Sequence, residues 1–262
     1  MKLRTLILAT ALVPLAPAMA QDEDGGSFLE RQIEGALTGA GREVQITGFE
    51  GALSSEARIA RMTISDSQGV WLTMENAVLD WNRTALLRAR LSVNTIRADR
   101  LEILRAPVSE SPAAPAPEAS GAFALPDLPV SVMINEMAIG SVELGPSFMG
   151  EALAFEVEGA ANLADGEGAL NLNVTRIDGP DAELTLAGAF ANATNQLDLN
   201  LSLAEGPGGI AASLMGLPGE PALDLTVAGS GPLDDFAADL ALATDGTDRI
   251  AGDVTLQGTT QG

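Results

Sequence analysis

The stretch "LDLNLSLAEG", residues 197–206, decides the fold that this sequence predicts. Its leucines occupy every second position and alternate with Asp198, Asn200 and Ser202. Because successive side chains of a β-strand point to opposite faces, the stretch predicts a strand with one leucine face and one polar face. Full burial of a leucine contributes roughly 1.5–3 kcal/mol, so the leucine face requires a cover. That cover is either a second layer of protein or a ligand such as an acyl chain.

The same alternation recurs on either side of this stretch, with polar turns about every 10 to 15 residues. Such spacing predicts hairpins in a meander. We therefore expect a mainly β protein, a curved antiparallel sheet with an apolar concave face. Gly188, Gly229 and Gly231 would permit bends in it. The predicted apolar groove comprises Leu184, Leu186, Leu197, Leu199, Leu201, Leu203, Leu223, Leu225 and Val227.

Residues 1–20, "MKLRTLILATALVPLAPAMA", predict a secretory signal peptide. A basic start precedes a short apolar run that is broken by prolines, and Ala18-Met19-Ala20 fits the small-x-small pattern of a cleavage site. We expect cleavage between Ala20 and Gln21, which would place the mature protein in the periplasm and cell envelope. Without cleavage, the same segment would anchor the chain in the inner membrane.

Three further regions follow the signal. Residues 27–105 read as an N-terminal amphipathic helix (27–41) followed by a β module, residues 106–126 as a Pro/Ala-rich linker, and residues 127–262 as a repetitive β region. The helix could pack on the first strands, plug the open end of the sheet or contact a membrane. The final strand stops in mid-pattern, so we expect the repetitive region to be truncated.

Composition and charge exclude several classes of function. The net charge is −22, and residues 106–262 hold 23 acidic residues but only two arginines, whereas nucleic-acid binding requires a basic patch. The chain has no Cys or His and a single lysine, Lys2, so disulfides and zinc sites are not possible. We considered the carboxylate pairs Asp234–Asp235 and Glu156/Glu158 for hydrolysis and set them aside, because nothing in the sequence raises the pKa of one partner. We expect no enzymatic activity, no cofactor and no metal.

The most specific stretch is "ITGFEGALSSEARIARMTISDSQGVWLTMENAVLDWNRTALLRARLSVNTIRADRLEILRAP", residues 46–107. It contains a Gly-x-x-Gly turn, a strand pair around an Asp-x-x-Gly turn, and a tryptophan followed by a Leu-Leu pair. These motif residues are Gly48, Gly51, Asp66, Gly69, Trp71, Trp81, Leu86 and Leu87. The stretch resembles the N-terminal region of the AsmA-like translocation and assembly module protein family, TamB. The simplest roles for its residues are a turn at Asp66 and Gly69 and core packing at the two tryptophans.

The resemblance implies an elongated, taco-like β-sheet trough that spans the periplasm and acts in outer-membrane protein assembly and secretion, with phospholipid transport also proposed. It also implies an outer-membrane barrel partner of the TamA type. We expect two departures from the family: an N-terminal segment that is cleaved, and a shorter chain without the family's partner-binding C-terminal domain. The alternative is an exported structural or adhesive β-sandwich or solenoid whose leucines contact only protein.

Overall fold

The computed structural model describes residues 34, 38, 42–51, 55–86, 90–108, 124–125 and 131–257. The signal peptide with Ala20 and Gln21, most of the expected 27–41 helix, most of the linker and Leu87 lie outside the described residues.

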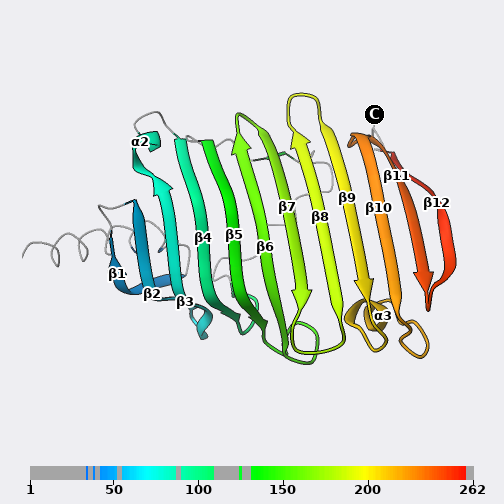
Figure 1. Ribbon diagram of the computed structural model, residues 1–262, viewed down its shortest axis with the longest axis horizontal. Helices are drawn as coiled ribbons and strands as arrows, with labels where there is room; N and C mark the ends of the chain where they lie inside the picture. Colours follow the sequence, from blue (N-terminus) through cyan, green and yellow to red (C-terminus); the bar gives the residue numbers. More distant parts are fainter. Residues whose placement is uncertain are drawn as a thin grey trace, which may run out of the picture.

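The described residues form one twelve-stranded sheet, with a short helix between β3 and β4 and another between β9 and β10 (Figure 1). The elements are β1 (Glu43–Glu50), β2 (Glu56–Asp66), β3 (Gly69–Asn82), α2 (Arg83–Leu86), β4 (Arg90–Ile103), β5 (Ser131–Leu144), β6 (Leu153–Ala164), β7 (Glu167–Arg176), β8 (Ala182–Ala191), β9 (Gln196–Glu205), α3 (Ile210–Leu214), β10 (Leu223–Pro232), β11 (Asp235–Thr244) and β12 (Thr247–Gln257).

Strand order in space follows strand order in the sequence, from β1 at one edge to β12 at the other. This curved, open sheet confirms the expected fold class. One junction differs from the expectation, because β4 and β5 pair in parallel while every other neighbouring pair is antiparallel. A parallel pair needs a connection that returns along the strands, and residues 104–130 supply one of ample length. The sheet therefore continues across the Pro/Ala-rich segment.

A crease crosses the first five strands and keeps their apolar residues on one face. Elsewhere in these strands, consecutive apolar residues are mostly two positions apart in the sequence. At the crease, this spacing is three positions in each strand, which corresponds to one inserted residue. The steps lie between Ile46 and Phe49, Ile59 and Met62, Met74 and Ala77, Ala98 and Leu101, and Ile139 and Val142. Strand β6 takes no such step, and the register between β5 and β6 shifts there.

Two residues on the crease have left-handed backbone conformations, Gly48 (φ 68°) and Asn76 (φ 51°). A Cβ on Gly48 would lie 2.7 Å from the Cβ of Ala60 on β2, so this position requires glycine. The expected Gly-x-x-Gly turn is therefore wrong at Gly48, which lies inside β1, whereas Gly51 (φ 71°) follows directly after the strand. Alternation along the sequence gave no sign of this role, because a bulge glycine and a turn glycine look alike there.

The two edges of the sheet differ. At β1, the outward N–H of Val44 donates to the hydroxyl of Thr38 (3.1 Å), and that of Ile46 donates to the carboxylate of Glu34 (2.7 Å). These contacts satisfy donors that an edge strand would otherwise expose. They place Glu34 and Thr38 of the expected 27–41 helix against the first strand. Among the described elements, none pairs with the outer edge of β12.

Candidate functional site: the apolar face

The strand register brings the nine residues of the predicted groove to one face of the sheet. Leu184 lies opposite Leu203, and Leu186 lies opposite Leu201. On the other side of β9, Leu203 and Leu201 lie opposite Leu225 and Val227. Leu197 and Leu199 continue the same side of β9, and Leu223 that of β10. Directly opposed residues of antiparallel strands share a face, so these side chains form one patch across β8, β9 and β10.

This patch is only partly covered. Eight of the nine side chains are half-buried, and Leu223 alone is buried, with 1% of its surface exposed. Within the described part of the chain, each strand packs against its neighbours in the sheet, and no second sheet lies on the leucines. Part of the burial energy expected for the leucines is therefore still available to a ligand or partner.

The same face continues beyond β8 toward the N-terminal strands. Leu172 and Val174 of β7 lie opposite Leu186 and Leu184. Val157 of β6 then lies opposite Val174. From β6, the strand register continues to pair apolar residues of this face with one another, through β5 and along the crease to β1. An apolar face thus runs over all the strands, at right angles to them.

One residue of the linker region is seated on this face. The backbone N–H of Leu125 donates to Asn192 Oδ1 (2.8 Å), and Asn192 Nδ2 donates to the carbonyl of Leu125 (2.9 Å). A Cβ on Gly168 would lie 2.9 Å from Leu125 Cδ1, so Leu125 contacts the sheet there. Beside it lies a shallow hollow of about 290 Å³ whose lining includes Leu163, Leu170, Phe190 and Leu197. The alternation pattern could not reveal this contact, because it depends on one amide in a distant turn.

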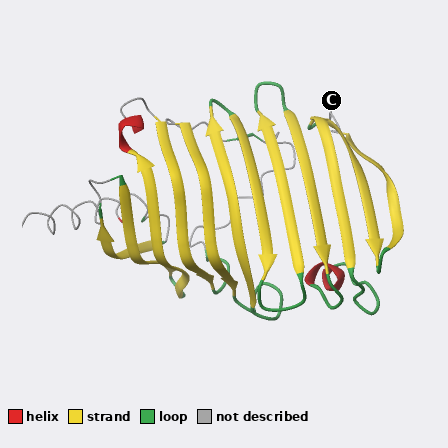
Figure 2. Ribbon diagram, viewed as in Figure 1, coloured by secondary structure: helices red, strands yellow, loops and turns green. Residues whose placement is uncertain are grey.

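Helix α3 closes the end of the patch at β9 and β10 (Figure 2). The buried carboxylate of Glu205, which follows the leucines on β9, accepts the N–H groups of Ala211 (2.9 Å) and Ala212 (3.2 Å). Ala212 and Leu223 are both fully buried at this point. A carboxylate is stable here because it satisfies donors that a helix start leaves free.

The opposite face of the sheet is polar and carries a hollow of about 680 Å³. Alanines and asparagines of β5 to β9 line it, including Ala138, Asn171 and Asn200. Small side chains leave this space, and it is open to solvent. This hollow therefore does not coincide with the apolar patch that the sequence predicted as the groove.

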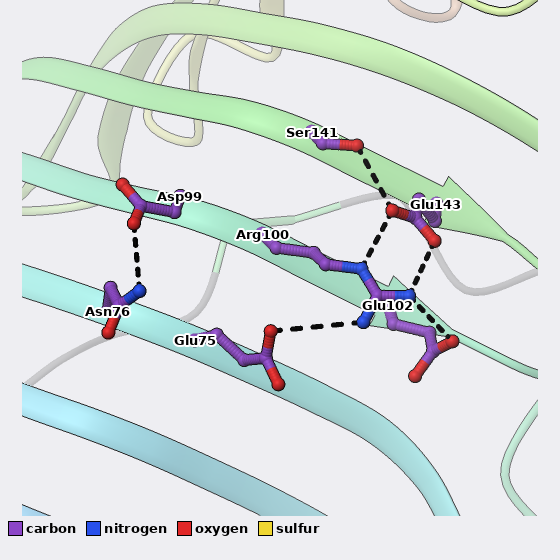
Figure 3. Close-up of polar contacts among 7 residues, drawn as sticks. All are labelled: Glu75, Asn76, Asp99, Arg100, Glu102, Ser141 and Glu143. Atoms are coloured by element: carbon purple, nitrogen blue, oxygen red, sulfur yellow. Dashed lines mark hydrogen bonds and ion pairs between the residues drawn. The ribbon is translucent and has the colours of Figure 1, made fainter.

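Arg100 fastens this polar face across the crease and the parallel β4–β5 pair (Figure 3). Its guanidinium makes a two-pronged contact with Glu143 of β5 (2.7 and 2.6 Å). It also contacts Glu102 (3.0 Å) and, at 3.8 Å, Glu75 of β3. The hydrogen bonds from Arg100 hold the pKa of the Glu143 carboxyl below its usual range. Beside this group, Asn76 donates to Asp99 (2.8 Å).

Of the motif residues singled out in the sequence, Asp66 ties the β2–β3 turn to Arg105. Asp66 accepts two hydrogen bonds from Arg105 and the N–H of Gln68, and Gly69 (φ 98°) completes the turn. Trp71 and Trp81 are half-buried on β3, and their indole N–H groups find no acceptor within the described residues. The side chain of Leu86 is not described.

The geometry defines an open, single-layer β-sheet protein with one apolar and one polar face. The described residues contain no cluster of three or more acidic groups that could hold a metal ion. No described helix is both long enough and apolar enough to cross a bilayer. Comparison of the chain with protein-family models, with curated proteins and with solved structures finds no match.

Proposed function

We propose that this chain is a periplasmic envelope protein of the TamB type. In this proposal it acts in outer-membrane protein assembly and secretion, in phospholipid transport, or in both, and it works with an outer-membrane barrel partner. Acyl chains would lie on the apolar face. The supporting observation is that this face continues from strand to strand while the leucines of β8 to β10 stay half-buried under no second layer. An exported sandwich would need such a layer.

Photo-crosslinking can test whether lipid contacts this face. The register offers a matched pair of probe positions on β8, since Leu186 lies opposite Leu201 and the adjacent Ala187 lies opposite Asn200 on the polar face. A photoreactive residue at Leu186 should crosslink phospholipid in cells, and one at Ala187 should not. Equal crosslinking at the two positions, or none at Leu186, would contradict the proposal.

A charged residue placed on the apolar face provides a second test of lipid contact. Leu201→Asp should reduce crosslinking at the Leu186 probe, whereas Asn200→Asp adds the same charge to the other face of the same strand and should leave it unchanged. An unpaired carboxylate among leucines lowers the stability of the folded state. Circular dichroism must therefore first show that both variants are folded. If both folded variants crosslink lipid as well as the parent, the leucines serve protein packing only.

A further inference from the structure

Exposed apolar side chains gather along the edge of the sheet that one set of strand ends forms, which is not an edge strand such as β1 or β12. The longer described loops join the strands at this edge. Eleven large apolar side chains of the described residues are exposed, and eight of them lie at this edge, with 37% to 67% of their surface exposed. Scattered exposed apolar residues need no explanation, but a concentration of this kind does. We name these eight residues the apolar rim: Val70, Leu104, Val108, Phe148, Met149, Ile177, Leu214 and Met215.

The rim is continuous because neighbouring loops contact one another. The hydroxyl of Ser147, in the β5–β6 loop, donates to the carbonyl of Leu104 at the end of β4 (2.9 Å). Arg176 at the end of β7 lies 3.7 Å from Glu151, so that loop also meets the β7–β8 connection. The N–H of Gly206, which opens the segment with α3, donates to the carbonyl of Asp181 (2.8 Å). The rim therefore extends from β3 to β10, along the lower edge in Figure 1.

The opposite strand ends are built differently. Their connections between β6 and β11 are short polar turns, such as Asp165-Gly166 and the segment 192–195. The three other exposed apolar residues are Met133, near the start of β5, and Ile250 and Val254 on β12. Among the described residues, exposed apolar loops are thus confined to one edge.

Charge at the rim narrows the choice of partner. The two arginines beside the loops of the rim pair with acids, Arg105 with Asp66 (2.6 Å) and Arg176 with Asp178 (2.9 Å), and Arg249 near the start of β12 donates to the hydroxyl of Thr244 (2.6 Å). Glu151 is largely exposed, and Glu220 lies in the same loop as Leu214. An anionic lipid surface would be repelled, because it favours free Lys and Arg.

The shape of the rim also bears on the partner. A stable protein interface buries about 800 Å² per partner in a broad, packed patch. The rim is instead a row one loop wide, in which the pairs Phe148–Met149 and Leu214–Met215 flank a hollow of about 480 Å³ that Glu151 and Glu220 also line. A bilayer interface accepts such side chains one by one, without a complementary surface.

We propose that the apolar rim docks onto the surface of a phospholipid bilayer with zwitterionic headgroups. Phe148, Met149, Leu214 and Met215 enter the interface, and the strands stand away from the membrane. The edge that holds the rim is the side of the sheet that α3 closes, so docking sets one long side of the apolar face beside the bilayer. The docking does not depend on whether lipid travels along that face.

The test compares two variants of the full chain in binding to phosphatidylcholine vesicles by flotation. The rim variant carries Phe148→Ser, Met149→Ser, Leu214→Ser and Met215→Ser. The control carries Met133→Ser, which removes an equally exposed apolar group from the polar face of the sheet, near the opposite strand ends. The partition coefficient of the rim variant should fall at least about tenfold, because several apolar side chains lose their burial together. That of the control should stay within about twofold of the parent.

A fluorescence measurement reads the rim directly and is insensitive to membrane binding by other parts of the chain. The chain has no cysteine, so Phe148→Cys and Met133→Cys each give a single site for an environment-sensitive dye. With phosphatidylcholine vesicles, the dye at position 148 should shift to the blue, and the dye at position 133 on the polar face should not. The absence of a shift at 148, a requirement for phosphatidylglycerol, or self-association of the parent that the rim variant abolishes would overturn the proposal. Lipid crosslinking on the apolar face is a separate readout, so either idea can fail alone.

Discussion

At the scale of single residues, Asp66 ties distant parts of the chain together. Its side chain is almost completely buried and accepts hydrogen bonds from Arg105 (2.6 and 2.8 Å), from the N–H of Val108 (2.7 Å) and from that of Gln68 (2.8 Å). These donors hold the pKa of Asp66 well below its usual range. The carboxylate thereby fastens the β2–β3 turn to the chain that leaves β4.

We expect Asp66→Asn to lower the urea midpoint of unfolding at pH 7. Because the pKa of Asp66 is depressed in the folded state, its stabilising contribution is complete above the ordinary Asp pKa of about 4 and is lost as the pH falls below that value. The gap between parent and variant should therefore narrow between about pH 4 and pH 2. The exposed Asp224→Asn serves as the control and should show little effect. A gap that is constant with pH would contradict this assignment.

A second prediction at the scale of single residues concerns Asn192. Replacing it by alanine removes both hydrogen bonds that hold Leu125 on the apolar face. With Leu125→Cys as a reporter, thiol labelling should therefore be several-fold faster in the Asn192→Ala background. Thr194→Ala, in the same turn, is the matched control and should not change the rate. Equal labelling in all backgrounds would show that the amide does not hold this contact.

At the scale of elements, the last hairpin contains an electrostatic conflict. Asp239 of β11 lies directly opposite Asp253 of β12. The hydrogen bond that a protonated Asp239 donates to the carboxylate of Asp253, together with the negative charge of Asp253, raises the pKa of Asp239. The pair therefore weakens the hairpin at neutral pH, and protonation relieves the conflict as the pH falls through the raised pKa.

We expect Asp253→Asn to protect β12 from limited proteolysis at pH 7, by about twofold or more, because it removes the repulsion and keeps a hydrogen-bonding partner. The advantage should largely vanish as the pH falls through the raised pKa of Asp239, since a protonated Asp239 no longer repels Asp253. The exposed Asp248→Asn changes the charge of the same strand without touching the pair. Protection by that control to the same extent would indicate a general charge effect.

The elements also show how far the sequence alone could lead. Alternation as in "LDLNLSLAEG" sufficed to predict the strands and the shared face of β8 to β10, because the side-chain period of a strand is two. Around Ile59 and Met62 the same pattern slips, and only the register shows that the slip belongs to a crease across five strands. The parallel β4–β5 pair, the seat of Leu125 and the apolar rim were not predictable, because they depend on long-range chain paths and on loops without periodicity.

At the scale of the whole molecule, each strand depends on its two neighbours alone within the described residues. A sheet of this kind behaves like a linear array, in which stability adds up from neighbour to neighbour. The end at β12 has one neighbour, whereas Glu34 and Thr38 stabilise the end at β1.

Native-state hydrogen exchange should therefore show graded protection. The amides that join β6 to β9 should exchange slowest, those of β1 and β2 at an intermediate rate, and those that join β11 to β12 fastest. Mass spectrometry of peptides from each strand would measure this order. A single rate for all strands would mean that the sheet opens as one cooperative unit and would refute the array description.

The sequential strand order also has a consequence for how the chain reaches this structure. Nearly every strand pairing joins segments that are adjacent in the sequence, so the entropic cost of loop closure is low for each pairing. A new hairpin can therefore add to the sheet as soon as it emerges from the ribosome. The exception is the β4–β5 junction, which must wait for the 27 residues between the two strands. Folding during synthesis should pause at this one point, with β1 to β4 already assembled, and then proceed strand by strand to β12.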